Sequence, residues 1–140
     1  MTRPSERGSA TLELAIIGPA LILLLALVIA AGRIQVAGGA VEQAAAAAAR
    51  EASIARTPAA AASLAEAAAT RVLTQQKLDC AAMTVTMDTS GYSAPVGQAG
   101  RVGATVACVV PLSDLGVPVL PAARTLAAQS TSVLDRYRAR

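Results

Sequence analysis

The sequence contains no histidine, phenylalanine or tryptophan, and only two tyrosines, among its 140 residues. The absence of histidine excludes catalytic triads that depend on it and histidine-ligated metal sites. Two cysteines alone are too few for a structural zinc site. The sequence has no phosphate-binding glycine loop, and its aspartates stand singly in the predicted loops and strands, at Asp79, Asp88, Asp114 and Asp135. We therefore expect no enzyme activity, no cofactor and no metal.

Charge is also sparse. The formal net charge is +3 and only 15% of the residues are charged. No basic cluster is interleaved with aromatic residues, so we do not expect nucleic-acid binding. Hydrophobic residues make up 54% of the chain, but many of them are alanine. Because alanine buries little apolar surface, at about 25 cal/mol per Å² removed from water, we expect a thin soluble part that needs extra support.

A long apolar run is the clearest positive feature. Residues 14–32 carry no charge, and as a helix they would extend about 28 Å, close to the roughly 30 Å hydrocarbon core of a bilayer. Arg3 and Arg7 precede the run and Arg33 follows it. This bias of positive charge favours an N-terminus in the cytoplasm and an extracytoplasmic C-terminal part. The chain is thus predicted to cross the cytoplasmic membrane once.

Two other interpretations of the run remain open. A cleavable secretory signal would share its basic start and its small residues at Ala30-Ala31-Gly32, although the run exceeds the usual 7–15 apolar residues. A plain membrane anchor would need only the run itself. Neither accounts for Glu13 at its entrance, because a carboxylate deep in hydrocarbon costs roughly 2.5–3.5 kcal/mol. A simple alternative for Glu13 is a place in the headgroup layer, favoured by the helix dipole.

The residues before the run carry a family resemblance. The segment Arg7-Gly8-Ser9-Ala10-Thr11-Leu12-Glu13, followed by Gly18-Pro19 and an alanine-rich helix, resembles TadE-like pseudopilins of tight-adherence (Tad, Flp-type) pilus systems, with a type IV pilin-like N-terminus. The resemblance implies that a prepilin peptidase cuts between Gly8 and Ser9. Glu13 would then be the fifth residue of the mature chain. Implied partners are other pilin-like subunits, the pilus assembly platform and the peptidase, besides the lipid bilayer.

Beyond the membrane run, the sequence predicts two helical segments. Residues 33–56 continue the first helix. Thr57-Pro58 ends it and begins another, because threonine is a good N-cap and proline suits the first helical position. We expect this second helix at residues 58–78, with an apolar stripe formed by Leu64, Ala67, Ala68, Val72 and Leu78.

Strands are predicted in the remaining part. Residues 83–88 alternate apolar and polar side chains, as a half-buried strand does. Residues 102–110 form a second strand, and the glycine- and proline-containing stretch 89–100 between them predicts an antiparallel hairpin. Met83, Val85 and Met87 would then share a face with alternate residues of the second strand. A long connection at 111–124 leads to residues 125–135, for which we favour a third strand over a helix. We expect the basic tail, 136–140, to fray.

Cys80 and Cys108 are predicted to form a disulfide if the C-terminal part is exported, since oxidising compartments permit such bonds. The alternative is two buried free thiols. Cys108 would point inward from the second strand, and Cys80 lies where the second helix gives way to the first strand.

Together these features predict an α+β protein with three parts. Residues 1–8 form a cytoplasmic leader, residues 9–56 a long N-terminal helix with its transmembrane part at 14–32, and residues 57–140 a small extracytoplasmic domain stapled by one disulfide. The predicted function is that of a minor pseudopilin in the assembly of a Tad-type pilus or secretion apparatus, with Glu13 setting subunit register. The alternative is a membrane-tethered extracytoplasmic binding module outside any pilus.

Overall fold

The computed structural model describes the backbone of residues 7–95, 97–113 and 121–134, and the side chains of these ranges from Glu13 onward. Its elements are two helices, α1 (Arg7–Ile54) and α2 (Pro58–Gln75), a short 3-10 helix, η1 (Ser90–Ser93), and three strands, β1 (Ala82–Asp88), β2 (Arg101–Pro111) and β3 (Ala123–Val133). Most of the predicted leader, the predicted tail, Asp114 and Asp135 lie outside the described residues.

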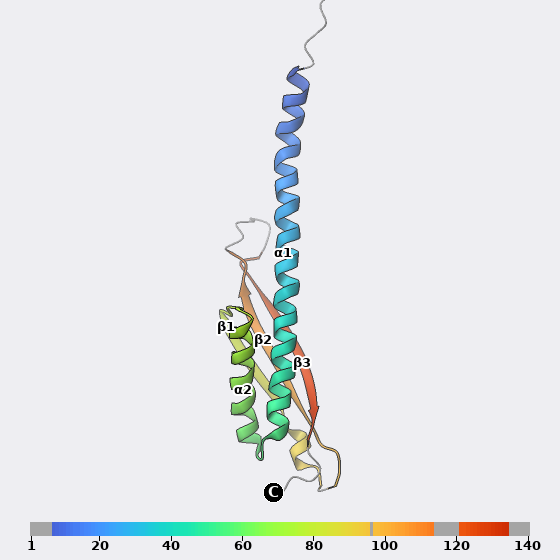
Figure 1. Cartoon of the computed structure of the whole chain (residues 1–140), viewed down its shortest axis with the longest axis vertical. Helices are drawn as coiled ribbons and strands as arrows, with labels where there is room; N and C mark the ends of the chain where they lie inside the picture. The colour runs from blue at the N-terminus through green and yellow to red at the C-terminus, as the bar shows by residue number, and fades with distance from the viewer. Residues whose placement is uncertain (1–6, 96, 114–120, 135–140) are drawn as a thin grey trace, which may run out of the picture.

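α1 extends far beyond the rest of the chain (Figure 1). Its C-terminal half, residues 37–54, packs with α2 and the sheet into a small unit that we call the head. The long N-terminal helix, the second helix, the antiparallel sheet and the α+β class predicted from the sequence are all confirmed.

The sheet has the order β1-β2-β3, and both neighbouring pairs are antiparallel. Met83 lies opposite Cys108 and Val85 opposite Val106, as the predicted hairpin requires. Residues 123–133 form the third strand, which confirms the strand prediction for this region and shifts its start two residues earlier. The inward face of β2 is the most deeply buried part of the sheet, with Val102, Val106 and Cys108 all fully buried. The two helices cover this face (Figure 1).

Alanine forms most of the core between α1, α2 and the sheet. Among the described side chains of the two helices, nine alanines are at most 1% exposed, whereas Leu73 is the one buried leucine. This corrects the predicted stripe on α2: Leu64 is 40% exposed, and Ala67 is exposed too. Small side chains let helix backbones approach closely, so the contact face of α2 is set by alanine rather than by its largest apolar residues. The buried residues of α2 are Ala61, Ala65, Ala68, Ala69 and Leu73.

Both ends of α2 follow from local chemistry. The Thr57 side chain accepts a hydrogen bond from the Ala60 N–H at 3.2 Å, and Pro58 occupies the first turn, as predicted. The helix ends at Gln75, three residues before the predicted Leu78, because Lys77 adopts a left-handed conformation with φ of 54°. The Lys77 and Leu78 N–H groups then bond back to the carbonyls of Thr74 and Leu73, which closes the helix end.

The far end of the head is closed by Tyr92. Its hydroxyl donates a hydrogen bond to the Ala52 carbonyl in the last turn of α1, which also accepts the Ala55 N–H at 3.1 Å. A turn after β1 positions Tyr92: the Asp88 carboxylate accepts a hydrogen bond from the Ser90 N–H, and its bonds to Ser90 lower the pKa of that carboxyl. Gly91 fits here because a Cβ atom would collide with the Arg101 backbone.

Cys80 and Cys108 form the predicted disulfide, with their Cα atoms 5.4 Å apart. The bond joins the segment after α2 to the central strand, and Cys108 is fully buried. It closes a loop with a sequence separation of 28 residues. In the chain-entropy account such a loop stabilises the folded state by roughly 3–4 kcal/mol. This contribution is large for a core that consists mainly of alanine.

Replacing both cysteines with alanine should lower the free energy of unfolding by about 3–4 kcal/mol, because the unfolded chain regains the entropy that the bond removes. Urea unfolding of the full chain in a neutral detergent measures this change. A reductant should weaken the parent chain by a similar amount and leave the double variant unaffected. A loss below about 1 kcal/mol would contradict the stabilising role.

Enlarging a buried alanine should destabilise the head. Ala44 is 0% exposed, so Ala44→Leu should cost about 1–3 kcal/mol by forcing α1 away from its neighbours. Ala46→Leu is the matched control because Ala46 is exposed on the same helix, and it should change stability by no more than about 0.5 kcal/mol. Equal effects in thermal unfolding would show that α1 packs through another face.

Candidate assembly site on the N-terminal helix

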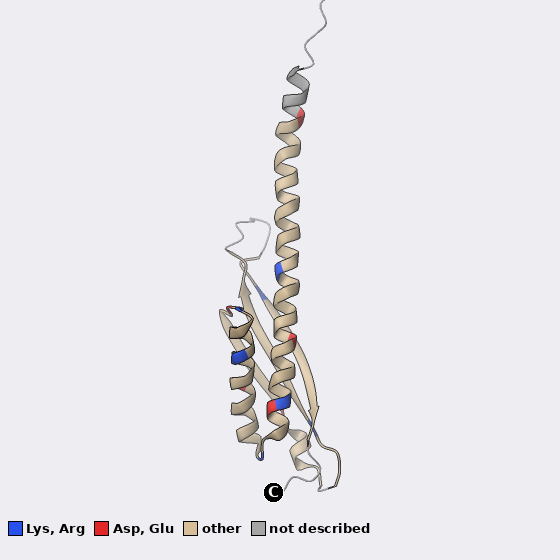
Figure 2. Ribbon diagram, in the orientation of Figure 1, with Lys and Arg blue, Asp and Glu red and all other residues tan. Residues whose placement is uncertain are grey.

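Glu13 stands at the start of the apolar half of α1. Its side chain is exposed, and the next charged residue along the helix is Arg33. Figure 2 shows this as an uninterrupted tan stretch of α1 between one acidic and one basic position. Arg33 follows Glu13 by twenty positions, which corresponds to a rise of about 30 Å along the helix. The two charges therefore lie about one hydrocarbon thickness apart.

The side chains between these charges are uncovered. Leu14, Ile16 and Ile22 are each more than 70% exposed, and the other large apolar residues from Ile17 to Ile29 are at least 40% exposed. They surround the helix rather than forming one stripe, and a helix that is apolar on all sides needs a cover of lipid or of other protein. Of the described helices, α1 is the one that is long and apolar enough to cross a membrane.

Gly8 and Ser9 lie in the first turn of α1. A helical peptide bond must unwind before a peptidase can bind it in an extended form. At this position unwinding costs little free energy, because the first turn has N–H groups without partners within the helix and glycine has a low helix propensity. The backbone placement is thus compatible with cutting at the predicted bond. The processing role of Gly8 and Ser9 stays a prediction.

Ser9 and Glu13 are four residues apart, which is about one helical turn and about 6 Å along the axis. A new α-amine on Ser9 would carry a positive charge at neutral pH, because its reference pKa is near 8. The predicted site therefore places a cation and an anion on one short stretch of helix. The registry role of Glu13 also stays a prediction.

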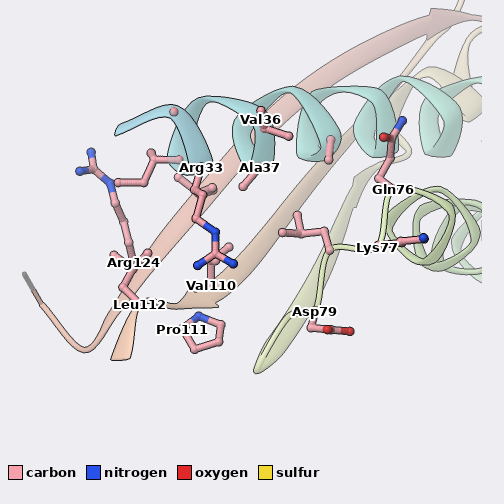
Figure 3. A pocket seen from close by; sticks show the side chains of 15 residues that line it. Arg33, Val36, Ala37, Gln76, Lys77, Asp79, Val110, Pro111, Leu112 and Arg124 are labelled. Carbon is pink, nitrogen blue, oxygen red and sulfur yellow. The ribbon is translucent and has the colours of Figure 1, made fainter. Parts of the chain in front are cut away.

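A cleft that the sequence did not predict lies where α1 enters the head. It has a volume of about 460 Å³ and lies between α1, the end of α2 and the adjoining ends of β2 and β3. Arg33 and Arg124 both line it (Figure 3). In the sequence Arg33 indicated only membrane orientation, and nothing linked it to Arg124, which lies 91 residues later. Elsewhere in the described part of the chain, no three His, Cys, Asp or Glu side chains gather as metal ligands would.

Comparison with known proteins supports the resemblance at the N-terminus. Residues 8–50 match the family model described as TadE-like protein. The match begins at Gly8, includes Glu13 and the whole apolar run, and ends within the part of α1 that packs in the head. It covers less than half of the chain. No curated protein and no solved structure matches the chain.

One helix of membrane length continuing into a small head indicates a single-pass membrane protein. The N-terminal 8–50 segment of that protein is TadE-like, which confirms the resemblance and indicates a relation to Tad pilus systems.

Proposed function

We propose that this chain is a minor pseudopilin that takes part in assembling a Tad-type pilus or secretion apparatus. The observation that carries the proposal is the TadE-like match over the segment that contains Gly8, Glu13 and the uncovered apolar half of α1. The chain would be made as a membrane precursor with its head outside the cytoplasm. It would be cut after Gly8 and then joined to other pilin-like subunits. Its role is packing and register, without catalytic turnover.

The uncovered apolar surface supports assembly as well as membrane insertion. Before assembly, lipid covers the side chains between Glu13 and Arg33. If the subunit enters a filament, neighbouring helices must replace that lipid, because exposing these side chains to water costs about 25 cal/mol for each Å² of apolar surface. Parallel helices of the same kind supply such a cover. The head, whose own core is closed, would project from the helical bundle.

Glu13 would then select the stagger between neighbouring helices. A charge left alone among apolar helices is costly, and a partner of opposite sign removes much of that cost. If the Ser9 amine of one subunit meets Glu13 of the next, the two helices are offset by about 6 Å along their axes. Other offsets separate the charges. The pair therefore contributes specificity of register, which is the best-supported use of a buried ion pair.

The mature N-terminus tests the processing step. Mass spectrometry of the chain isolated from its own cells should find Ser9 as the first residue, and a strain without the prepilin peptidase should yield the uncut leader. An intact leader in the normal strain would favour a plain anchor or a tethered binding module. A start near Ala31 would indicate secretion after signal cleavage. Either result would overturn the proposal.

Replacing Glu13 with glutamine tests the registry role. Glu13→Gln keeps the size of the side chain and removes its charge, so membrane insertion should be unchanged. Loss of one partner of a buried pair costs 3–5 kcal/mol, so co-assembly with other pilin-like subunits should fall by about 100-fold or more. Glu42→Gln, at an exposed position in the head part of α1, is the matched control. Both variants are compared by membrane fractionation and by pilus yield, and normal piliation in Glu13→Gln would refute the pairing.

A further inference from the structure

The cleft lies where α1 enters the head, at the end of the head that faces the apolar half of α1. Gly32 and Arg33 line it, and these two residues mark the end of the uncharged run. The cleft is therefore placed at the bilayer surface if α1 spans the membrane with residues 14–32. This placement depends on membrane insertion alone and does not require that the chain joins a pilus.

The cleft combines cationic side chains with apolar walls. Its charged residues are Arg33, Lys77, Arg124 and Asp79, which gives three cations and one anion. Figure 3 shows Arg33 reaching from α1 toward Pro111 at the end of β2, while Arg124 extends from β3 toward the N-terminal part of α1. Lys77 and Asp79 lie at the opposite, α2 end of the cleft. The apolar walls are formed by Ile34, Ala37, Leu78, Val110, Leu112 and Leu126.

The two arginines lie at the membrane-facing end of the head. Figure 2 shows basic positions of α1 and of the sheet at the membrane-facing end. Around the C-terminal end of α1, the sequence carries Arg50, Glu51 and Arg56, so charges of both signs are present there. Among the described residues of the head, the excess of positive charge is therefore local to the cleft. It is not a property of the whole head, whose charges are mixed.

We propose that this cleft holds the headgroup of an anionic phospholipid from the leaflet beneath the head. Arg33 binds the phosphodiester, since a guanidinium group matches phosphate oxygens with two parallel hydrogen bonds, and Arg124 adds a second positive charge to the lining of the cleft. The first carbons of the acyl chains lie along Ile34 and Val36 and continue into the bilayer beside the exposed residues of α1. Basic pockets next to membrane-spanning helices are suited to anionic headgroups in this way.

The apolar walls favour a lipid over a free anion. A free phosphate would occupy only the cationic part and would leave the walls in contact with water, whereas a phospholipid covers both parts. The volume of the cleft, about 460 Å³, falls within the range of about 300–1,000 Å³ that is typical of ligand pockets. A headgroup with its glycerol fits this size, and the acyl chains need no room because the bilayer surrounds them. Bound lipid would fix the distance and the rotation of the head relative to the membrane.

Native mass spectrometry of the full chain in a neutral detergent tests the proposal with short-chain phosphatidylglycerol and phosphatidylcholine as probes. The chain should bind phosphatidylglycerol at least tenfold more tightly than phosphatidylcholine. The variant R33Q/R124Q should bind it about 25-fold more weakly, at about fivefold for each arginine. The matched control R56Q/R101Q removes the same net charge from the far end of the head and should change the affinity less than twofold. R33K/R124K, which keeps both charges, should retain most of the binding.

Several results would overturn the proposal: equal binding of the two lipids, equal weakening in R33Q/R124Q and R56Q/R101Q, or displacement of phosphatidylglycerol by equimolar inorganic phosphate. The last result would indicate a site for free anions. Circular dichroism and the melting temperature show whether each double variant keeps the fold of the parent chain.

A second measurement leaves both arginines in place. The chain has no tryptophan, so Val36→Trp introduces a single fluorescent reporter at a cleft residue that is 75% exposed. In bilayers, phosphatidylglycerol brominated near the headgroup should quench it at least twofold more than equally brominated phosphatidylcholine. Ile54→Trp, at an exposed position at the far end of α1, should be quenched by neither. Equal quenching of the Val36→Trp reporter by both lipids would indicate ordinary bilayer contact and would overturn the selective site.

Discussion

The structure depends on one constraint: α1 is a continuous helix that must satisfy two unlike surroundings. Its N-terminal half presents large branched aliphatic side chains on all sides, and its C-terminal part presents mostly alanine to a protein interior. Away from its ends, and apart from Pro19, which has no N–H, α1 satisfies its own backbone hydrogen bonds, so it can pass from lipid into protein without a break. The same element therefore anchors the chain and forms the largest part of the head core.

The alanine core determines what else the head needs. Fully buried alanines allow α1, α2 and the sheet to pack closely, but each removes little apolar surface from water. The remaining stability must come from features that do not depend on side-chain size. The Cys80–Cys108 bond restricts the unfolded chain near one end of the head, and Tyr92 gives the last turn of α1 a hydrogen-bond donor at the other. One of the chain's two tyrosines thus has a structural role at the junction of helix and sheet.

The order of elements could be predicted from local signals. The uncharged run, the Thr57-Pro58 pair and the alternation from Met83 to Asp88 each identify an element, and the inward position of Cys108 follows from the period of its strand. The packing face of the helices could not be predicted in this way. Residues 44–49 are six consecutive alanines, so the sequence has no contrast between faces. Only the tertiary contacts bury Ala44 and leave Ala46 exposed.

The two candidate sites, Glu13 and the cleft, differ in how far they could be predicted from the sequence. Glu13 could be identified because placing a charge beside an apolar run costs free energy, and both the charge and the run can be recognised in the sequence. The cleft could not be predicted in this way, because Arg33 and Arg124 come to line one cleft only after the sheet has formed and β3 has been aligned with β2. A site built from a helix end, a strand end and a turn has no spacing pattern that could be recognised beforehand.

The two candidate sites mark the ends of one membrane-length segment. Glu13 and Arg33 are separated by about 30 Å along the helix, so a bilayer of ordinary thickness places each charge in a headgroup layer. In that position Glu13 is hydrated and needs no partner. Transfer of the helix into a protein bundle would remove this hydration, and the carboxylate would then require a cation supplied by a neighbour. If the chain assembles as proposed, the Glu13 charge, which costs little free energy in the membrane, would select the partner helix, while lipid bound in the cationic cleft would favour the membrane-bound state. Release from lipid and pairing of Glu13 would then be opposing contributions to one equilibrium.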